Sequence, residues 1–365
     1  MAVTTTRVPG ASPPAARPRT DERLTAVSLL TRLLQRPEFG ALLGAIAVFV
    51  LFAFTDATND HLWLSWTGLR DWTTVAADYG IMAVAVAMLM IGGEFDLSAG
   101  VMTGSTPILM GLIITRLGWN AWLAIAAAFA FAALIGLING VVVVTTKLPS
   151  FIVTLATFFV LRGANVGVLL LINGNEFVGV DPNSPPAGFD SARKVFGSHF
   201  TSTPTPGFDT SVLWWLGLTA IATWVLTRTT FGNWTFAAGG DSEAARKVGV
   251  PVNRTKILLF MGTSMSAALV GIIGFTRLSQ ATPTQGIGLE FFYIIAAVVG
   301  GCLLTGGYGS AIGATLGACV VGMAGEGVII SHWNTDWNYT FLGVMLFLAV
   351  VVNTFIRRHA LRARR

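Results

Sequence analysis

The sequence is poor in charged residues and in cysteine. Only 11% of its 365 residues are Asp, Glu, Lys or Arg, whereas 53% are hydrophobic. A soluble domain carries about 25% charged residues, so this chain has too few to cover a water-facing surface of its size. The deficit excludes an ordinary soluble protein and indicates that lipid is the main solvent. The two cysteines, Cys302 and Cys319, lie in apolar Gly/Ala-rich runs, and their spacing matches no metal or redox motif.

The motifs of common enzymes are also absent. No Gly-Lys dipeptide occurs, so the chain has no Walker A phosphate loop and is not expected to hydrolyse ATP by that route. It has no Gly-x-Ser-x-Gly, Cys-x-x-Cys or His-x-x-x-His pattern. We therefore expect no catalytic residue, no bound metal and no cofactor on this chain. A membrane-embedded enzyme finds no support.

Ten apolar segments are long enough, or nearly so, to cross a bilayer. A transmembrane helix needs about 20 mostly apolar residues, because each residue rises about 1.5 Å and the hydrocarbon core is about 30 Å thick. The segments are 39–55, 73–91, 99–116, 120–144, 150–172, 212–227, 257–276, 288–304, 310–330 and 339–356. The sequence thus predicts an all-α membrane protein with about ten transmembrane helices. The second and third segments, and likewise the eighth and ninth, are separated by glycines, which is compatible with broken or re-entrant elements.

The chain divides into a membrane domain and two tails. Residues 1–38 are interpreted as a cytoplasmic N-terminal tail, residues 39–356 as the transmembrane domain, and residues 357–365 as a basic cytoplasmic tail. With the N-terminus in the cytoplasm, six arginines before residue 39 and five basic residues after residue 356 lie inside, whereas only five basic residues lie outside. The positive-inside rule favours this orientation, with both termini cytoplasmic.

Two connecting segments are long. Residues 173–211 are expected to form an irregular external loop, because they contain five prolines and several glycines. Residues 228–256 are expected in the cytoplasm, with a short helix that Asp241 or Ser242 caps and Gly249 ends. On these grounds alone the short helix is equally well a solvated connector.

Two glycine pairs repeat in the two halves of the chain. Gly92-Gly93 precedes a polar break and a new apolar run, and Gly300-Gly301 does the same. Repeated broken helices are typical of a transport pathway. Glycines also permit close helix packing, and the repeat alone does not decide between these interpretations.

Two carboxylates lie between the second and third apolar segments. Glu94 and Asp96 would each cost about 2.5–3.5 kcal/mol at the bilayer centre. Such groups occupy water-filled cavities, helix ends or positions beside a partner. The sequence therefore predicts either contact with a polar solute or a turn at the membrane edge in which Asp96 or Ser98 caps the next helix.

A second polar set consists of Asn139, Ser150, Thr154 and Thr157. Its three hydroxyl residues share one helix face and either line a hydrophilic path or bond back to their own helix carbonyls. Arg162 falls within a predicted span. We expect it to pair with Glu326, Asp78 or Glu290, or to extend to an interface.

Three segments resemble the permease family of bacterial monosaccharide ABC importers, the ribose, xylose and fructose type. They are Gly93–Gly100 (GEFDLSAG), Asn139–Gly163 with its central KLPSFIVTLAT run, and Glu243–Val250 (EAARKVGV). They are similar to that family's glycine–aspartate–leucine–serine signature, its central block and its coupling helix. The Gly-rich block Val299–Gly317 also fits, and the resemblance covers about residues 39–356.

The chain departs from the family's commoner pattern at four positions. Glu94 and Phe95 stand where a second Gly and an Ile are more frequent, Val101 replaces a usual Ser, and Ser150 replaces a frequent Pro. The Gly-Glu-Phe-Asp version resembles the fructose-like branch.

The resemblance implies a type II importer-like permease that moves fructose, ribose or a similar pentose or polyol. Expected partners are a second identical copy, two ATPase domains that hold ATP and Mg, an external sugar-binding protein (periplasmic or lipid-anchored) and the bilayer of a bacterial inner membrane, with no nucleic acid. The coupling helix would comprise Asp241, Ser242, Glu243, Ala244, Ala245, Arg246, Lys247 and Gly249. The substrate path or gate would include Glu94, Phe95, Asp96, Ser98, Asn139, Phe151, Thr154, Thr157, Gly300 and Gly301.

An ion-coupled secondary carrier or channel for a small polar solute is the alternative function. A proton-driven carrier would show a denser set of buried ionisable groups than this sequence offers.

Overall fold

The structure is a computed structural model that describes residues 37–56, 61–181, 183–200, 207–348 and 351. The expectations for the two tails therefore lie outside the described residues, apart from positions 37 and 38. So does the end of the last predicted span, of which residues 339–348 are described as helix.

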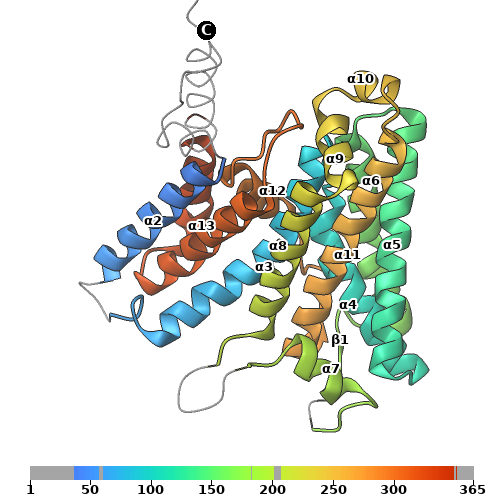
Figure 1. The fold of residues 1–365 in the computed structure, drawn as a ribbon. Helices are drawn as coiled ribbons and strands as arrows, with labels where there is room; N and C mark the ends of the chain where they lie inside the picture. The colour runs from blue at the N-terminus through green and yellow to red at the C-terminus, as the bar shows by residue number, and fades with distance from the viewer. Residues whose placement is uncertain (1–36, 57–60, 182, 201–206, 349–350, 352–365) are drawn as a thin grey trace, which may run out of the picture.

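The described residues form a helical bundle in which eight helices are long and apolar enough to cross a membrane (Figure 1). They are α2 (Pro37–Asp56), α3 (Trp66–Ile91), α4 (Ser98–Leu117), α5 (Ala121–Thr146), α6 (Ser150–Asn173), α8 (Thr210–Arg228), α11 (Val252–Leu278) and α13 (Ala311–Ile330). The prediction of an all-α, multi-pass membrane protein is confirmed.

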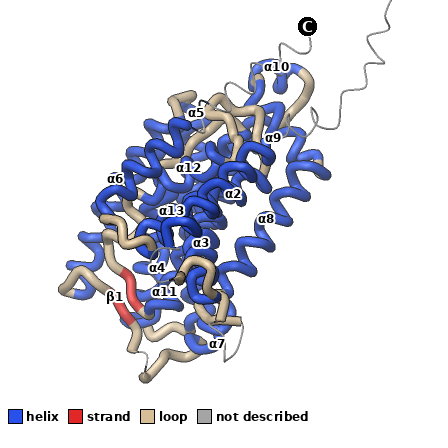
Figure 2. The backbone as a smooth tube through the Cα atoms, turned by 90° about the vertical axis from the view of Figure 1, so that its left-hand side faces the viewer, coloured by secondary structure: helices blue, strands red, loops and turns tan. Residues whose placement is uncertain are grey.

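Shorter elements gather at the two ends of the bundle. At one end lie α9 (Thr230–Gly240) and α10 (Ser242–Lys247). At the opposite end lie α7 (Phe189–Phe196) and the two-stranded sheet of β1 (Val178–Gly179) and β2 (Gln280–Ala281). Figures 1 and 2 show this separation from two directions. We call the two ends the α10 face and the α7 face.

The long helices differ in how much of their surface is covered. In an apolar stretch of 18 residues within α4, 83% of the residues are buried within the chain. The corresponding share is only 22% in α2 and in α6. The outer helices expose large apolar side chains such as Phe54, Val160 and Leu171. Lipid or another apolar partner must cover these surfaces, which agrees with the low charge content of the sequence.

One predicted span does not exist as a spanning helix. The segment 288–304 contains α12 (Leu289–Val299), whose 11 residues rise only about 16 Å. That is too short for a hydrocarbon core of about 30 Å. In contrast, the first glycine-interrupted pair forms two full helices, α3 and α4, joined by a break at residues 92–97.

Both long connections contain helices that the sequence interpretation missed. The predicted external loop 173–211 includes β1 and α7, and the predicted loop 228–256 includes α9. Thr229 is the C-cap of α8 and the N-cap of α9. Its Oγ1 accepts a hydrogen bond from the Gly232 N–H at 3.2 Å. α11 begins at Val252, five residues before the predicted start. The connection is therefore folded along most of its length.

Candidate transport site and coupling helix

The two glycine pairs have the same backbone geometry. Gly92 and Gly300 both end a helix in right-handed conformation, and Gly93 and Gly301 follow with φ of 82° and 92°. The next residues are Glu94 and Cys302. Each donates its N–H to the carbonyl of the residue five positions earlier, with N···O distances of 3.2 Å for Glu94 and 3.0 Å for Cys302. This pattern closes a helix with a left-handed residue, for which glycine is favoured. The sequence repeat is thus a repeated structural element.

A chain of hydrogen bonds ends on Asp96. Thr157 Oγ1 donates to Asn139 Oδ1 at 2.6 Å, and Asn139 Nδ2 donates to Ser98 Oγ at 3.0 Å. Ser98 Oγ then donates to Asp96 Oδ1 at 2.5 Å, and the Ser98 N–H reaches the same oxygen at 2.8 Å. Bonds of one direction polarise one another in a low-dielectric interior. The structure therefore brings together four residues that the sequence analysis singled out.

The position of this hydrogen-bond chain shows how far below the α10 face the first break lies. Asn139 lies seven residues before Thr146, where α5 ends, and Thr157 lies seven residues after Ser150, where α6 begins. Seven helical residues rise about 10 Å. Since both helix ends lie at the α10 face, α4 starts about 10 Å below that face rather than at the centre of the bundle.

The hydroxyls at the start of α6 stabilise the break. Ser150 Oγ accepts the N–H of Phe95 at 3.0 Å, and Thr154 Oγ1 accepts the N–H of Leu97 at 3.1 Å. Thr154 also donates to the Ser150 carbonyl at 2.8 Å. Of the two uses considered for these hydroxyls, the bond back to the helix's own carbonyl is present at Thr154. The same oxygen also accepts an N–H from the break, because a hydroxyl oxygen can accept one bond and donate another.

The two carboxylates have different surroundings. Asp96 is 2% exposed, and its Oδ2 has no hydrogen-bond partner among the described residues. Glu94 is 7% exposed and forms an ion pair with Lys256, in the second turn of α11. Asp96 both supports the start of α4 and retains a free acceptor, whereas Glu94 is held by a cation.

The remaining predicted pathway residues do not join this group. The Phe151 side chain is 53% exposed on the outside of α6. Gly300 packs against Gly313 at the start of α13, and a Cβ at Gly300 would lie 2.6 Å from the Ala314 nitrogen. Gly301 follows in the second break. Phe151 therefore touches the site only through its carbonyl, which lies 3.5 Å from Thr154 Oγ1, and the two glycines belong to the second break.

The segment between α11 and α12, which consists of β2 and a run of turns, re-enters the bundle along α4. β1, which pairs with β2, places Val178 against Gly111 of α4, and further along α4 the backbone of Gln285 lies against Gly104. Glu290, which is 5% exposed, lies beside Gly100. Non-helical backbone at membrane depth is tolerated only where protein or a water-filled cavity covers it. The glycines of α4 make room for it, which explains why α12 is short.

α10 is a short helix with a well-formed cap. Asp241 Oδ1 accepts the N–H groups of Glu243 at 3.0 Å and Ala244 at 2.9 Å, as an N-cap residue does. Within the helix only Ala245 is buried, and Val248, which follows it, is 79% exposed. The predicted cap and helix are present, and most of the helix faces away from the bundle.

An ion-pair network at the α7 face was missed in the sequence. Arg277 at the end of α11 donates to both oxygens of Asp78 in α3, at 3.1 Å each, and its Nε lies 3.9 Å from Asp209. His199 Nδ1 lies 3.0 Å from Asp209. Asp78 therefore pairs with Arg277 and not with Arg162, which is exposed on α6. The paired residues are 199 positions apart, so no local pattern signals the contact.

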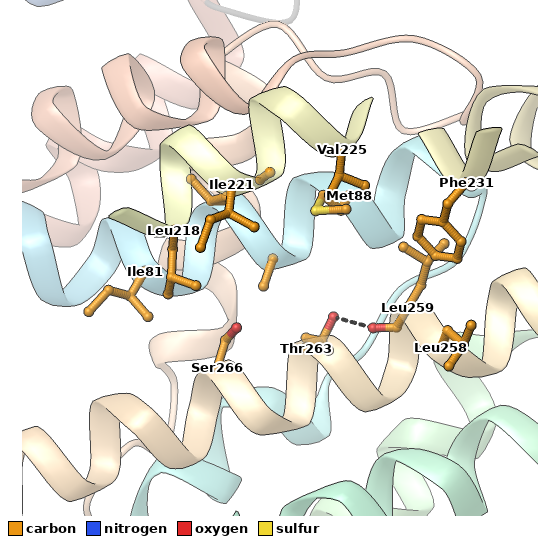
Figure 3. A pocket seen from close by; sticks show the side chains of 14 residues that line it. Ile81, Met88, Leu218, Ile221, Val225, Phe231, Leu258, Leu259, Thr263 and Ser266 are labelled. Carbon is orange, nitrogen blue, oxygen red and sulfur yellow. Dashed lines mark hydrogen bonds between the residues drawn. The ribbon is translucent and has the colours of Figure 1, made fainter. Parts of the chain in front are cut away.

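A cavity of about 160 Å³ lies between α3, α8, α9 and α11 (Figure 3). It is lined by Ile81, Val84, Ala85, Met88, Leu218, Ile221, Ala222, Val225, Phe231, Leu258, Leu259, Gly262, Thr263 and Ser266. Its hydroxyls come from Thr263, which already donates to the Leu259 carbonyl at 3.0 Å, and Ser266. So apolar a lining does not suit a polyhydroxylated solute. None of the predicted pathway residues lines it.

No cluster in the described part of the chain is suited to a metal ion. No group of three or more His, Cys, Asp or Glu side chains there is placed to hold one.

The profile of a family described as "Branched-chain amino acid transport system / permease component" matches residues 68–350. The chain belongs to this family. The ribose import permease protein RbsC of Escherichia coli (strain K12) is 31% identical over 312 residues, which cover 84% of this chain and 92% of RbsC. The fructose import permease protein FrcC of Rhizobium meliloti is 30% identical over 92% of this chain and 86% of its own length. The xylose transport system permease protein XylH of Escherichia coli (strain K12) is 30% identical over 86% and 91%.

These comparisons confirm the family resemblance drawn from the three sequence segments. As a transport-system permease component, the chain is a transporter subunit and not an enzyme, and ATP hydrolysis belongs to a separate subunit. Permeases of this family operate with an ATPase and a substrate-binding protein. No solved structure matches the chain significantly.

Proposed function

We propose that this permease imports a monosaccharide, either fructose, ribose or a similar pentose or polyol. The sugar would arrive on an external binding protein at the α7 face and leave at the α10 face, which we place in the cytoplasm of a bacterial cell. Two identical copies would work with two ATPase domains that bind ATP and Mg. The support for a sugar is that the ribose, fructose and xylose permeases align with most of this chain.

The observation that carries ATP-driven coupling is the exposed, capped α10. A separate ATPase subunit needs a rigid element of the permease to bind. α10 offers one because its cap fixes its start and Ala245 packs with Ala238 of α9 and Val252 of α11. The exposed residues Glu243, Arg246 and Lys247 provide charge of both signs, and Val248 provides an apolar contact. Exposed apolar side chains rimmed by charge are typical of docking surfaces.

The hydrogen-bond chain at the first break is our candidate for the gate of the substrate path. The free Oδ2 of Asp96 and the hydroxyls around it can accept and donate bonds to sugar hydroxyls. Glu94, Phe95, Asn139, Phe151, Thr154, Thr157, Gly300 and Gly301 belong to the same proposal through their places in the two breaks and in α5 and α6. Sugar specificity would reside chiefly in the external binding protein.

The test is ATP-driven uptake by the complete transporter. The permease would be reconstituted with its ATPase and its sugar-binding protein in proteoliposomes, with each candidate sugar supplied in radiolabelled form. Uptake of at least one monosaccharide should require both ATP and the binding protein. The variants Glu243→Lys and Arg246→Glu should lower uptake per ATP hydrolysed while inserting normally. Arg116→Gln at the α7 end of α4 is the control for insertion.

Two results would overturn the proposal. Uptake that follows a proton or sodium gradient in vesicles without any ATPase would assign the chain to the ion-coupled carriers or channels. Normal sugar uptake by both α10 variants would show that α10 does not couple ATP hydrolysis to transport.

A further inference from the structure

α10 is connected to the first helix break on its N-terminal side by close backbone contacts. Gly239, at the end of α9, lies against the break so tightly that a Cβ there would overlap the Ile91 carbonyl oxygen and come within 2.9 Å of the Gly92 carbonyl carbon. It would also lie 2.8 Å from the nitrogen of Gly307 in the second break. The Gly307 N–H in turn donates to the Ile91 carbonyl at 2.9 Å. Three chain segments thus meet at Gly239.

On its C-terminal side, α10 is connected to the same break by an ion pair. Lys256 lies four residues after α11 begins, and its Nζ donates to Glu94 Oε1. The two side chains are only 14% and 10% exposed. An ion pair with so little water around it is screened weakly, and loss of either partner leaves an uncompensated buried charge.

We propose that Lys256 is a positioning residue for transport, which together with Gly239 transmits movement of α10 to the break at Glu94–Ser98. This inference rests on the proposed coupling function of α10. α10 itself buries only Ala245, so a force applied to it reaches the bundle through its two flanks. Both flanks end on the residues that precede α4. Movement of α10 would therefore displace the start of α4 and the hydrogen-bond chain at Asp96.

The first test compares the charge pair with a neighbouring charge. Lys256→Met and Glu94→Gln should lower sugar uptake per ATP hydrolysed by about tenfold or more, while the ATPase rate of the reconstituted complex changes less than about threefold, since α10 still docks. Arg254→Met, an exposed change two residues away on α11, should leave the ratio unchanged. The charge-reversed double variant Glu94→Lys/Lys256→Glu should recover most of the ratio.

The outcomes separate this inference from the proposed function. If unmodified protein shows ATP-dependent uptake and Lys256→Met couples normally, the positioning role is wrong and the proposed function stands. If uptake and ATPase activity fall together and the reversed pair restores neither, the ion pair is merely structural and the inference is also wrong. If uptake by unmodified protein is independent of ATP, both proposals fail.

A second test addresses the glycine contact and does not depend on a charge. Gly239→Ala must displace the Ile91 carbonyl and should lower uptake per ATP by about tenfold. Gly240→Ala is the matched control, because its Cβ would meet nothing within 4 Å. Equal coupling ratios for the two alanine variants would overturn the role of Gly239.

Discussion

Arg277 binds Asp78 through two hydrogen bonds of 3.1 Å each, so that the end of α11 is fixed to α3 at the α7 face. Near the other end of α11, Lys256 pairs with Glu94 just after α3 ends. One helix is therefore held to the same neighbour by an ion pair near each face of the bundle. In alternating access one face opens while the other closes. Because the two ion pairs are separate, one can break at its face while the other still holds α11 against its neighbour.

The Arg277–Asp78 pair should contribute measurably to stability. Replacement of one partner in a buried pair costs about 3–5 kcal/mol, but Arg277 and Asp78 are 26% and 28% exposed, so we expect about 2 kcal/mol for Arg277→Leu. The measurement is the thermal unfolding midpoint in detergent. Arg193→Leu, an exposed change on α7, is the control and should have little effect. Equal midpoints for the two variants would contradict the prediction.

Asn139 should be the most sensitive residue of the hydrogen-bond chain. It is fully buried and bonded to both Ser98 and Thr157. Asn139→Leu removes both bonds. The buried Ser98 hydroxyl then lacks a donor, at a cost of about 1–3 kcal/mol, whereas the half-buried Thr157 keeps its bond to the Val153 carbonyl at 3.3 Å. We expect a clear loss of thermal stability together with loss of uptake. Thr145→Ala on the exposed side of α5 is the control, and a fully stable Asn139→Leu variant would show that the chain is dispensable.

The sequence predicts those parts of the fold that depend on local properties. Long apolar runs identify the spanning helices, because burial in lipid depends on length and hydropathy. The cap of α10 was predicted from Asp241 and its neighbours, because a cap is formed within four residues. The two glycine pairs are also a local pattern, although their repeat alone does not decide between broken helices and close helix packing. In each case the energy that shapes the element comes from residues adjacent in the chain.

What the sequence misses depends on tertiary contacts. The non-helical path that leads to α12 requires the surface of α4 at Gly100 and Gly104, which no local pattern reveals. The partners of Asp78 and Glu94 lie 199 and 162 positions away. α7 carries a weak local signal, since Asp190 stands in its first turn and Lys194 in its last, as the helix dipole favours.

The contact between α3 and α13 should depend on Gly322. A Cβ at this position would lie 2.7 Å from the Cα and Cβ of Ala76, so Gly322→Ala must push two central helices apart. Such overpacking typically costs about 1–3 kcal/mol. Gly325→Ala, on the same helix with nothing within 4 Å of its Cβ, should be neutral or stabilising, because Ala favours a helix over Gly by up to about 1 kcal/mol. Thermal unfolding of the two variants in detergent checks the prediction, and destabilisation of equal size would contradict it.

The cap of α10 should control how well the motor subunit binds. Asp241→Ala removes the acceptor of two N–H groups and costs about 1 kcal/mol of local helix stability. Because α10 has only six residues, that loss is enough to unfold it part of the time and should weaken binding of the purified ATPase about threefold to fivefold. Asp241→Asn and Asp241→Ser retain a capping oxygen and should bind almost normally. If Asn and Ser weakened binding as much as Ala, the carboxylate charge rather than the cap would be the feature that the ATPase recognises.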